Sequence, residues 1–161
     1  MNTTNQILIA DAQLEDIDVL LAGLMPNTKV WLVQRNENAM SYIFKALAEP
    51  NLSKLHLLAH GVSGGILLGN KTLTATDFRR QFDGAAQRDL DIAFWSCETG
   101  KGAEGLAFVQ AVAEATGAKV SATSGLIGAA DKNGSWELDI SVQPPFSAKA
   151  REEFGHVLID V

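Results

Sequence analysis

Leu55-His56-Leu57-Leu58-Ala59-His60-Gly61 is the stretch of sequence that decides the fold. Its residues from Leu55 to Ala59 predict a strand, and this strand ends abruptly at His60-Gly61. A second apolar run, Leu90 to Trp95, ends in Ser96-Cys97. Two apolar strands that each lead into a reactive side chain predict a central sheet with functional groups beyond its strand ends.

Strands and helices alternate along the chain around this stretch. Apolar runs at 7–10, 29–33, 55–59, 90–95 and 119–122 predict strands, and helical spacing of apolar residues between most of them predicts helices. Residues 66–73 contain the turn pair Gly69-Asn70 and predict a β-hairpin after His60. Such alternation is typical of right-handed crossovers. The sequence therefore predicts an α/β three-layer sandwich, with a mainly parallel central sheet and helices on both faces.

The C-terminal part of the chain is less regular. Trp136, Leu138 and Ile140 alternate with polar residues, which predicts a half-exposed strand near a sheet edge. Pro144-Pro145 follows it. We therefore expect an α/β domain over residues 1–143 and a tail or linker over 144–161.

Composition excludes several classes of function. The chain has 161 residues and a net charge of −6 with no basic run, which argues against a nucleic-acid partner. Its apolar stretches are far shorter than the ~20 residues that cross a bilayer, so we expect no membrane insertion, and its start has no signal peptide. One cysteine allows no internal disulfide, and the Cys and His residues are too few to cluster around zinc. We expect no metal and no cofactor.

Four polar residues follow predicted strands and are the candidate site. Asp11, His60 and Cys97 come directly after strands, and Ser124 lies just past another. Because parallel strands end at one edge of the sheet, we expect these residues to share one rim. A thiol near a histidine, with backbone N–H groups aimed at an oxyanion, is what a cysteine peptidase needs. Gly61 leaves its own N–H uncovered by a side chain.

The chain resembles the caspase-like cysteine peptidases, which include caspases, legumain, gingipains, clostripain and metacaspases. Two blocks carry the resemblance, Leu57 to Gly61 and Ile92 to Cys97, with a hairpin between them. The resemblance implies a caspase-like fold, related in architecture to flavodoxin, and a His/Cys dyad. His60 would be the general acid/base and Cys97 the nucleophile, and the amides of Gly61 and Cys97 would form the oxyanion hole.

More narrowly, the chain resembles domain-of-unknown-function family 4347, which is found near the start of very large bacterial surface proteins with cadherin-like or RTX-type repeats. Its features here include Trp95-Ser96-Cys97-Glu98-Thr99-Gly100 and Gly134-Ser135-Trp136-Glu137-Leu138. This resemblance covers roughly residues 6 to 140. It implies a secreted or cell-surface setting in bacteria, within an adhesin.

The substrate side of the site is predicted from position. Several caspase-like peptidases have an acid after a strand that lines a pocket for Arg or Lys, and Asp11 matches that acid by location. The resemblance thus implies a substrate contact at Asp11 and cleavage after a basic residue, and the position of Ser124 just past a strand predicts a further substrate contact there. Asp11 could equally cap the first helix. Glu98, next to the thiol, is expected to raise the cysteine pKa and to disfavour the thiolate.

Three functions remain open on the sequence. The first is a cysteine endopeptidase acting on a protein or peptide, either its own parent chain or a neighbouring surface protein. The second is a catalytically inactive caspase-like interaction module of a large bacterial adhesin, because a lone cysteine is usually a small buried residue. The third is a flavodoxin-like binder of small molecules, although no Gly-x-Gly-x-x-Gly motif follows the first strand.

Overall fold

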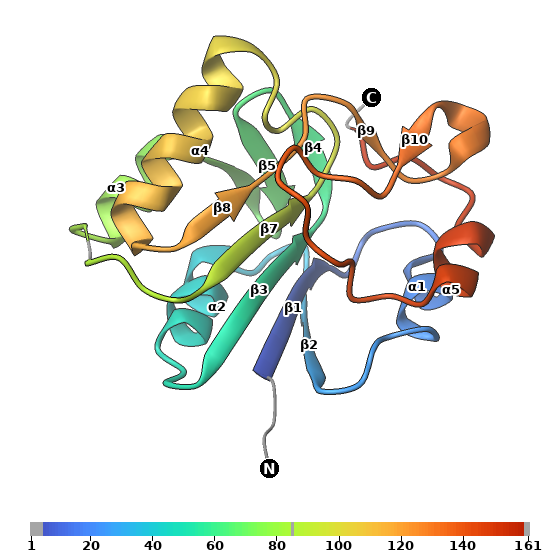
Figure 1. Ribbon diagram of the computed structural model, residues 1–161, viewed down its shortest axis with the longest axis horizontal. Coiled ribbons are helices and arrows are strands. Elements are labelled where there is room, and N and C mark those ends of the chain that lie inside the picture. Colours follow the sequence, from blue (N-terminus) through green and yellow to red (C-terminus); the bar gives the residue numbers. More distant parts are fainter. Residues whose placement is uncertain (1–4, 85, 160–161) are drawn as a thin grey trace.

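The computed structural model describes residues 5–84 and 86–159 and contains a central sheet of five parallel strands (Figure 1). The strand order is β2-β1-β3-β7-β8, so the order reverses between β1 and β3. The predicted mainly parallel sheet is confirmed. Its strands are β1 (Asn5–Asp11), β2 (Thr28–Val33), β3 (Leu52–Leu58), β7 (Asp91–Trp95) and β8 (Lys119–Ser121).

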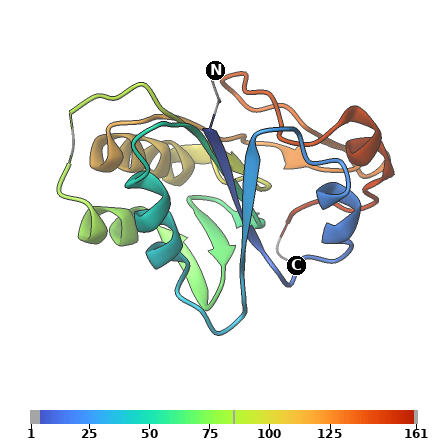
Figure 2. The same ribbon diagram turned by 90° about the horizontal axis from the view of Figure 1, so that it is seen from below.

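Helices cover both faces of this sheet, which makes the three-layer α/β sandwich that the sequence predicts (Figures 1 and 2). One face carries α2 (Ala39–Leu47), α3 (Ala75–Gln81) and α4 (Gly102–Thr116). The other carries α1 (Ile17–Leu21) and α5 (Ala148–Glu153), which lie side by side. Each face has its own apolar core. Within the described residues, no helix has the length and apolar character to span a membrane.

The register of the sheet brings the strand ends to one level. Leu58 at the end of β3 pairs with Trp95 at the end of β7, and Ala10 in β1 pairs with Leu58. His60 and Cys97 each lie two residues beyond the β3–β7 pair. The candidate residues therefore lie at the same edge of the sheet because the parallel strands pair in this register.

A small antiparallel sheet follows β3 directly. It consists of β4 (His60–Val62), β5 (Gly65–Leu68) and β6 (Lys71–Thr74), in that order. The hairpin predicted over 66–73 is β5 and β6 and is confirmed. α3 begins after Thr74, whose amide donates to Asp77 Oδ2 at 2.8 Å, as in a capping box.

The strand predicted from the alternation of Trp136, Leu138 and Ile140 is wrong. The structure has no strand over residues 136–140. The strand just before them, β10 (Gly134–Ser135), has two residues, and it pairs with β9 (Leu126–Ile127), from which the 3₁₀ turn Ala130–Lys132 separates it. Ile140 bonds the side chain of Ser121 instead of a backbone ladder, with its carbonyl accepting from Ser121 Oγ at 2.6 Å. A side-chain bond of this kind replaces the pairing that a strand needs.

The chain after Pro144 packs closely on the α1 face. Phe146 and Phe154 are buried on either side of α5, and Leu158 is 1% exposed. All three belong to the same apolar core as Trp95 and Cys97. Residues 156–159, called the C-terminal segment below, therefore lie against the end of the central sheet.

Candidate active site

Two backbone amides converge on one carbonyl oxygen at the edge of the sheet. The Gly61 amide and the Cys97 amide each donate to the Leu158 carbonyl oxygen, both at 2.9 Å. One donor comes from β4 and the other from the loop after β7. These are the two amides that the resemblance assigns to an oxyanion hole, and the C-terminal segment supplies the oxygen that they hold.

The loop that carries Cys97 packs closely against Gly61, because Gly61 has no side chain. A methyl group at position 61 would overlap the carbonyl oxygen of Cys97 and contact Thr99 Oγ1. The Cys97 loop is fixed from the other side by buried hydroxyls: Thr99 Oγ1 donates to the Gly65 carbonyl at 3.0 Å and lies 2.6 Å from Ser96 Oγ. Glu98 has a left-handed backbone with φ of 61°, which turns the chain sharply after the thiol. The two loops thus form one rigid unit.

The Cys97 thiol is fully buried beneath this unit. Its Sγ accepts a hydrogen bond from the Ile127 amide at 3.2 Å and lies 3.5 Å from the Ile127 carbonyl. Burial raises the pKa of the thiol to about 11; the amides of Ile127 and Leu158 act against this effect, and the Glu98 carboxylate adds to it. In this arrangement the thiol is a protonated group, and few thiolates exist near neutral pH.

His60 lies beside the C-terminal segment. It is partly buried, and its Nδ1 atom is buried with no hydrogen-bond partner among residues 5–84 and 86–159. No hydrogen bond joins His60 to Cys97 within that part of the chain. His60 instead lines a cavity of about 220 Å³ together with Leu158 and Ile159. His60 and the two residues that flank the Leu158–Ile159 peptide bond therefore line the same cavity.

Asp11 lies close to His60 at the end of β1. Its Oδ1 accepts the Gln13 amide at 2.8 Å within the loop that follows the strand. Burial raises the pKa of the Asp11 carboxyl, while the Gln13 amide and the nearby His60 act in the opposite direction. The alternative that Asp11 caps the first helix is wrong, because α1 begins at Ile17 with Asp16 as its N-cap.

Ser124 lies in an exposed bend between β8 and β9. The next residue, Gly125, accepts the Glu98 amide at 2.8 Å, so this bend adjoins the loop that carries Cys97. The structure thus brings Asp11, His60 and Cys97 to the predicted rim and places Ser124 at its solvent edge. The roles of these residues stay predictions.

The C-terminal segment is bound like an added strand, which no pattern in the sequence predicts. It bridges β4 in parallel through Gly61 and Ile159, and it bridges Gly128 antiparallel through Val157. The Leu158 amide donates to the Ile127 carbonyl at 2.9 Å. This pairing depends on residues that are far apart in the sequence, so no local sequence pattern predicts it.

A cluster of charged side chains holds the start of this segment. His156 Nε2 lies 2.7 Å from Asp16 Oδ2, and His156 Nδ1 lies 3.8 Å from Glu15 Oε1. Potential ligand atoms of these three residues lie within 4.8 Å of one another. Both acids are exposed, and the contacts link α1 to the C-terminal segment. We read the cluster as a clasp between these two elements.

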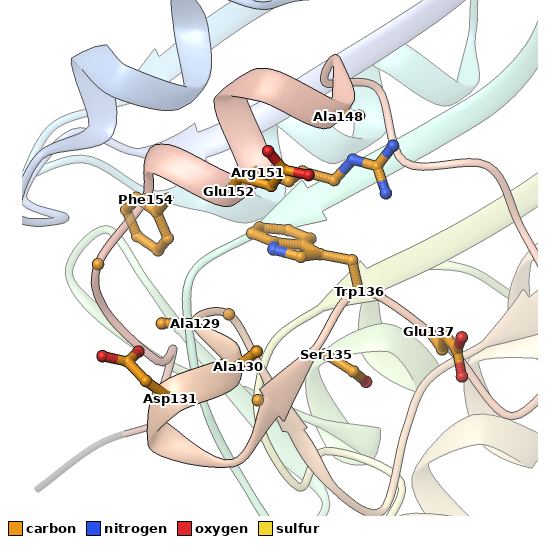
Figure 3. A pocket seen from close by; sticks show the side chains of 13 residues that line it. Ala129, Ala130, Asp131, Ser135, Trp136, Glu137, Ala148, Arg151, Glu152 and Phe154 are labelled. Atoms are coloured by element: carbon orange, nitrogen blue, oxygen red, sulfur yellow. The ribbon is translucent and has the colours of Figure 1, made fainter.

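A larger cavity of about 590 Å³ lies on the other side of the C-terminal segment, between α5 and the turn before β10 (Figure 3). The Trp136 ring lies between the helix and the turn, beside Phe154 (Figure 3). Arg151 Nε donates to the Phe146 carbonyl at 3.2 Å. Gly128 lines this cavity and also packs against His156 and Val157 of the C-terminal segment, so the cavity adjoins the candidate site.

A family model for a domain of unknown function, DUF4347, matches residues 7–158. The chain belongs to the DUF4347 family. The match reaches beyond residue 140, where the sequence resemblance ends, and includes α5 and Leu158. No curated protein matches this DUF4347 chain significantly.

Proposed function

We propose that this DUF4347 domain is a cysteine endopeptidase of the caspase-like type. Cys97 is its nucleophile, His60 its general acid and base, and the amides of Gly61 and Cys97 its oxyanion hole. Its substrate is a protein or peptide segment. The proposal uses only groups that the chain itself carries, with no metal and no cofactor.

One observation carries the proposal. Two amides from separate loops donate to the same carbonyl oxygen at 2.9 Å, next to a thiol that belongs to one of the two donating residues. Oxyanion donors are expected 2.7–3.1 Å from the developing charge, as the general geometry of such sites requires. A structural cysteine needs no such pair of donors. His60 further supports the proposal, because its buried Nδ1 atom has no hydrogen-bond partner among the described residues and its side chain shares a cavity with Leu158.

The chemistry follows from these positions. The Cys97 sulfur attacks the carbonyl carbon whose oxygen the two amides hold, and negative charge develops on that oxygen. The amides stabilise this charge without reorganisation, because their loops are already fixed. His60 accepts the thiol proton and delivers it to the departing nitrogen.

The arrangement described here is a closed form of such a site. The thiol is fully buried, and its pKa is raised to about 11 chiefly by this burial. The C-terminal segment occupies the oxyanion position, so a foreign peptide binds only after this segment leaves. Its departure uncovers the thiol and removes part of the cause of the raised pKa.

An inactive interaction module is the second candidate, and the thiol itself favours it. Cys97 is 0% exposed, and its sulfur is hydrogen-bonded to Ile127. A cysteine that stays in this environment packs as a small apolar residue. For either candidate, we propose from the family resemblance a place near the start of a large bacterial surface protein.

The test opens the site and measures the thiol. Leu158→Asp places a carboxylate at a position that is 1% exposed. Because burying this charge costs free energy, the C-terminal segment should dissociate from the site. The folded variant is treated at pH 7.5 with electrophilic peptides ending in leucine or in arginine, and Cys97 modification is read by intact mass. Leucine and arginine probes separate an aliphatic from a basic preference, the latter being the one implied by Asp11.

We expect rapid modification of Cys97 in Leu158→Asp, slowed about 100-fold or more when His60→Ala is added. Far-UV circular dichroism and thermal melting establish that both variants are folded. Equal rates with and without His60, or modification of Cys97 only in denatured protein, would refute the peptidase and leave the interaction module.

A further inference from the structure

The C-terminal segment is bound in the way that a peptidase binds a substrate. Its backbone pairs on both sides, with β4 through Ile159 and with the β9 side through Val157. Backbone pairing of an extended peptide with strand edges is a general mode of peptide recognition. The carbonyl at its centre, that of Leu158, accepts from both oxyanion amides.

Both reactive residues, Cys97 and His60, lie near the residues that flank the peptide bond after Leu158. The Cys97 amide donates to the Leu158 carbonyl, and the Leu158 amide lies close enough to the sulfur to lower the thiol pKa. His60 lines the cavity of about 220 Å³ that Leu158 and Ile159 also line. Cleavage requires a nucleophile near the carbonyl carbon and a proton donor near the leaving nitrogen, and these contacts bring both residues to the segment that carries this bond.

The side chain of Leu158 fixes the segment in register. It is 1% exposed and belongs to the apolar core that contains Cys97, Ile127 and Phe154. Burying a leucine side chain contributes roughly 1.5–3 kcal/mol. Burial of this aliphatic side chain therefore keeps the Leu158 carbonyl in place against the amides of Gly61 and Cys97.

We propose that the domain cleaves its own chain between Leu158 and Ile159, and that its substrates share the features of this segment. They are extended peptides with an aliphatic residue whose carbonyl enters the oxyanion hole. This inference rests on the proposed function and names its substrate. It assigns the cleaved bond to a segment that follows the helix α5.

The reaction is a peptide hydrolysis in two steps. The Cys97 thiol gives its proton to His60 while sulfur bonds to the Leu158 carbonyl carbon; the bond from that carbon to the Ile159 nitrogen breaks, and His60 protonates this nitrogen. Water then adds to the thioester carbon and loses a proton to His60. The carbon–sulfur bond breaks, which frees the Cys97 thiol and a Leu158 carboxylate.

The raised thiol pKa predicts a slow reaction. With a pKa of about 11, only a small fraction of thiols is ionised at pH 7. Because His60 takes the thiol proton as sulfur attacks, the reaction starts from the protonated thiol, and the cleavage rate of the closed chain should change by less than about threefold between pH 7 and 9. Cleavage within one chain should also proceed with a rate constant that does not depend on protein concentration.

The experiment incubates the full chain at several pH values and follows its intact mass over days. We expect a product that ends at Leu158, absent from Cys97→Ala and His60→Ala. Leu158→Asp should abolish cleavage at this bond, since the segment no longer docks. Ile159→Val, which keeps the backbone and an aliphatic side chain, is the matched control and should be cleaved within about threefold of the original rate.

The outcomes separate this inference from the proposed function. A product ending at Leu158 that requires both Cys97 and His60 supports both. No such product, together with His60-dependent labelling of Cys97 in Leu158→Asp, overturns self-cleavage and leaves the peptidase standing. Absence of both product and labelling overturns the two together. A product that persists in Cys97→Ala also overturns the inference, because another activity then makes the cut.

Discussion

At the scale of single residues, burial keeps both Cys97 and His56 in their neutral forms, but the two side chains have different surroundings. Cys97 meets a carbonyl that two amides hold, whereas His56, four residues before His60, sits inside the sheet. Trp95 Nε1 donates to His56 Nδ1 at 2.9 Å, so His56 Nε2 carries the proton and donates to Gln6 Oε1 at 2.8 Å. Both ring nitrogens are thereby satisfied in the neutral form. His56 is a structural residue, in contrast to His60.

This neutral state predicts an acid-sensitive fold. Burial lowers the pKa of His56 from 6.5 to about 3, with a smaller contribution from Lys54. Between these pH values His56 is protonated in the unfolded chain and neutral in the folded chain. Its contribution to the free energy of unfolding is therefore fully present above pH 6.5 and decreases as the pH falls toward 3. We expect a slope approaching about 1.4 kcal/mol per pH unit from this residue, in urea unfolding followed by tryptophan fluorescence.

His56→Gln is the variant that isolates this residue. It should be less stable at pH 7 by about 1–3 kcal/mol, because the bonds to Trp95 and Gln6 are disturbed. Its disadvantage should shrink as pH falls from 6.5 to 4, since the variant has no group to protonate there. A disadvantage that stays constant over that range would contradict the assignment of a neutral buried histidine.

At the scale of elements, the contacts of His156 with Asp16 and Glu15 form a clasp that joins the start of α1 to the C-terminal segment. The segment contributes Leu158 to the apolar core, while His156 binds Asp16 at 2.7 Å at the surface. Exposed pairs of this kind contribute only about 0–1 kcal/mol. The clasp therefore adjusts how often the segment opens, whereas burial of Leu158 decides that it is closed most of the time.

Asp16→Asn measures the clasp without changing the shape of the side chain. We expect Cys97 in the variant to react with iodoacetamide up to about fivefold faster at pH 7, the equivalent of up to about 1 kcal/mol in the opening equilibrium. Glu153→Gln removes the same charge from an exposed position on α5 and is the matched control. Equal acceleration by both variants would mean that charge near the thiol, and not the clasp, sets its reactivity.

At the scale of the whole molecule, the site is assembled at the point where the strand order reverses, between β1 and β3. Asp11 comes from the first of these strands and His60 from the chain after the second, while Cys97 follows the neighbouring β7. The C-terminal segment lies across these strand ends but belongs to no strand of the central sheet. It can therefore leave while the five strands stay paired.

Hydrogen exchange tests this separation. The Leu158 amide, although bonded to Ile127, should exchange through local opening with a free energy several kcal/mol below that of global unfolding. Amides of β1 and β3 in the centre of the sheet should exchange only on global unfolding. Mass spectrometry of peptides from both regions, over a range of denaturant, reports the two free energies. Identical values would show that the segment opens only when the domain unfolds.

The sequence by itself determined the α/β class, the parallel sheet and the rim on which Asp11, His60 and Cys97 meet. These features follow from local rules: apolar runs form strands, helical spacing forms helices, and parallel strands end at one edge. The hairpin over 66–73 could be predicted for the same reason, because the turn pair Gly69-Asn70 directly follows a short apolar run.

Only the tertiary structure decided what occupies the site. The predicted strand around Leu138 failed because Ile140 bonds the Ser121 side chain, a contact that no alternation of residues reveals. The position of Leu158 depends on bonds to Gly61, Cys97 and Ile127, which the fold brings together from β4, the loop after β7 and β9. Periodicity records which face of an element is apolar. It does not record which distant carbonyl oxygen comes to lie against two free amides, because that depends on how all the layers pack.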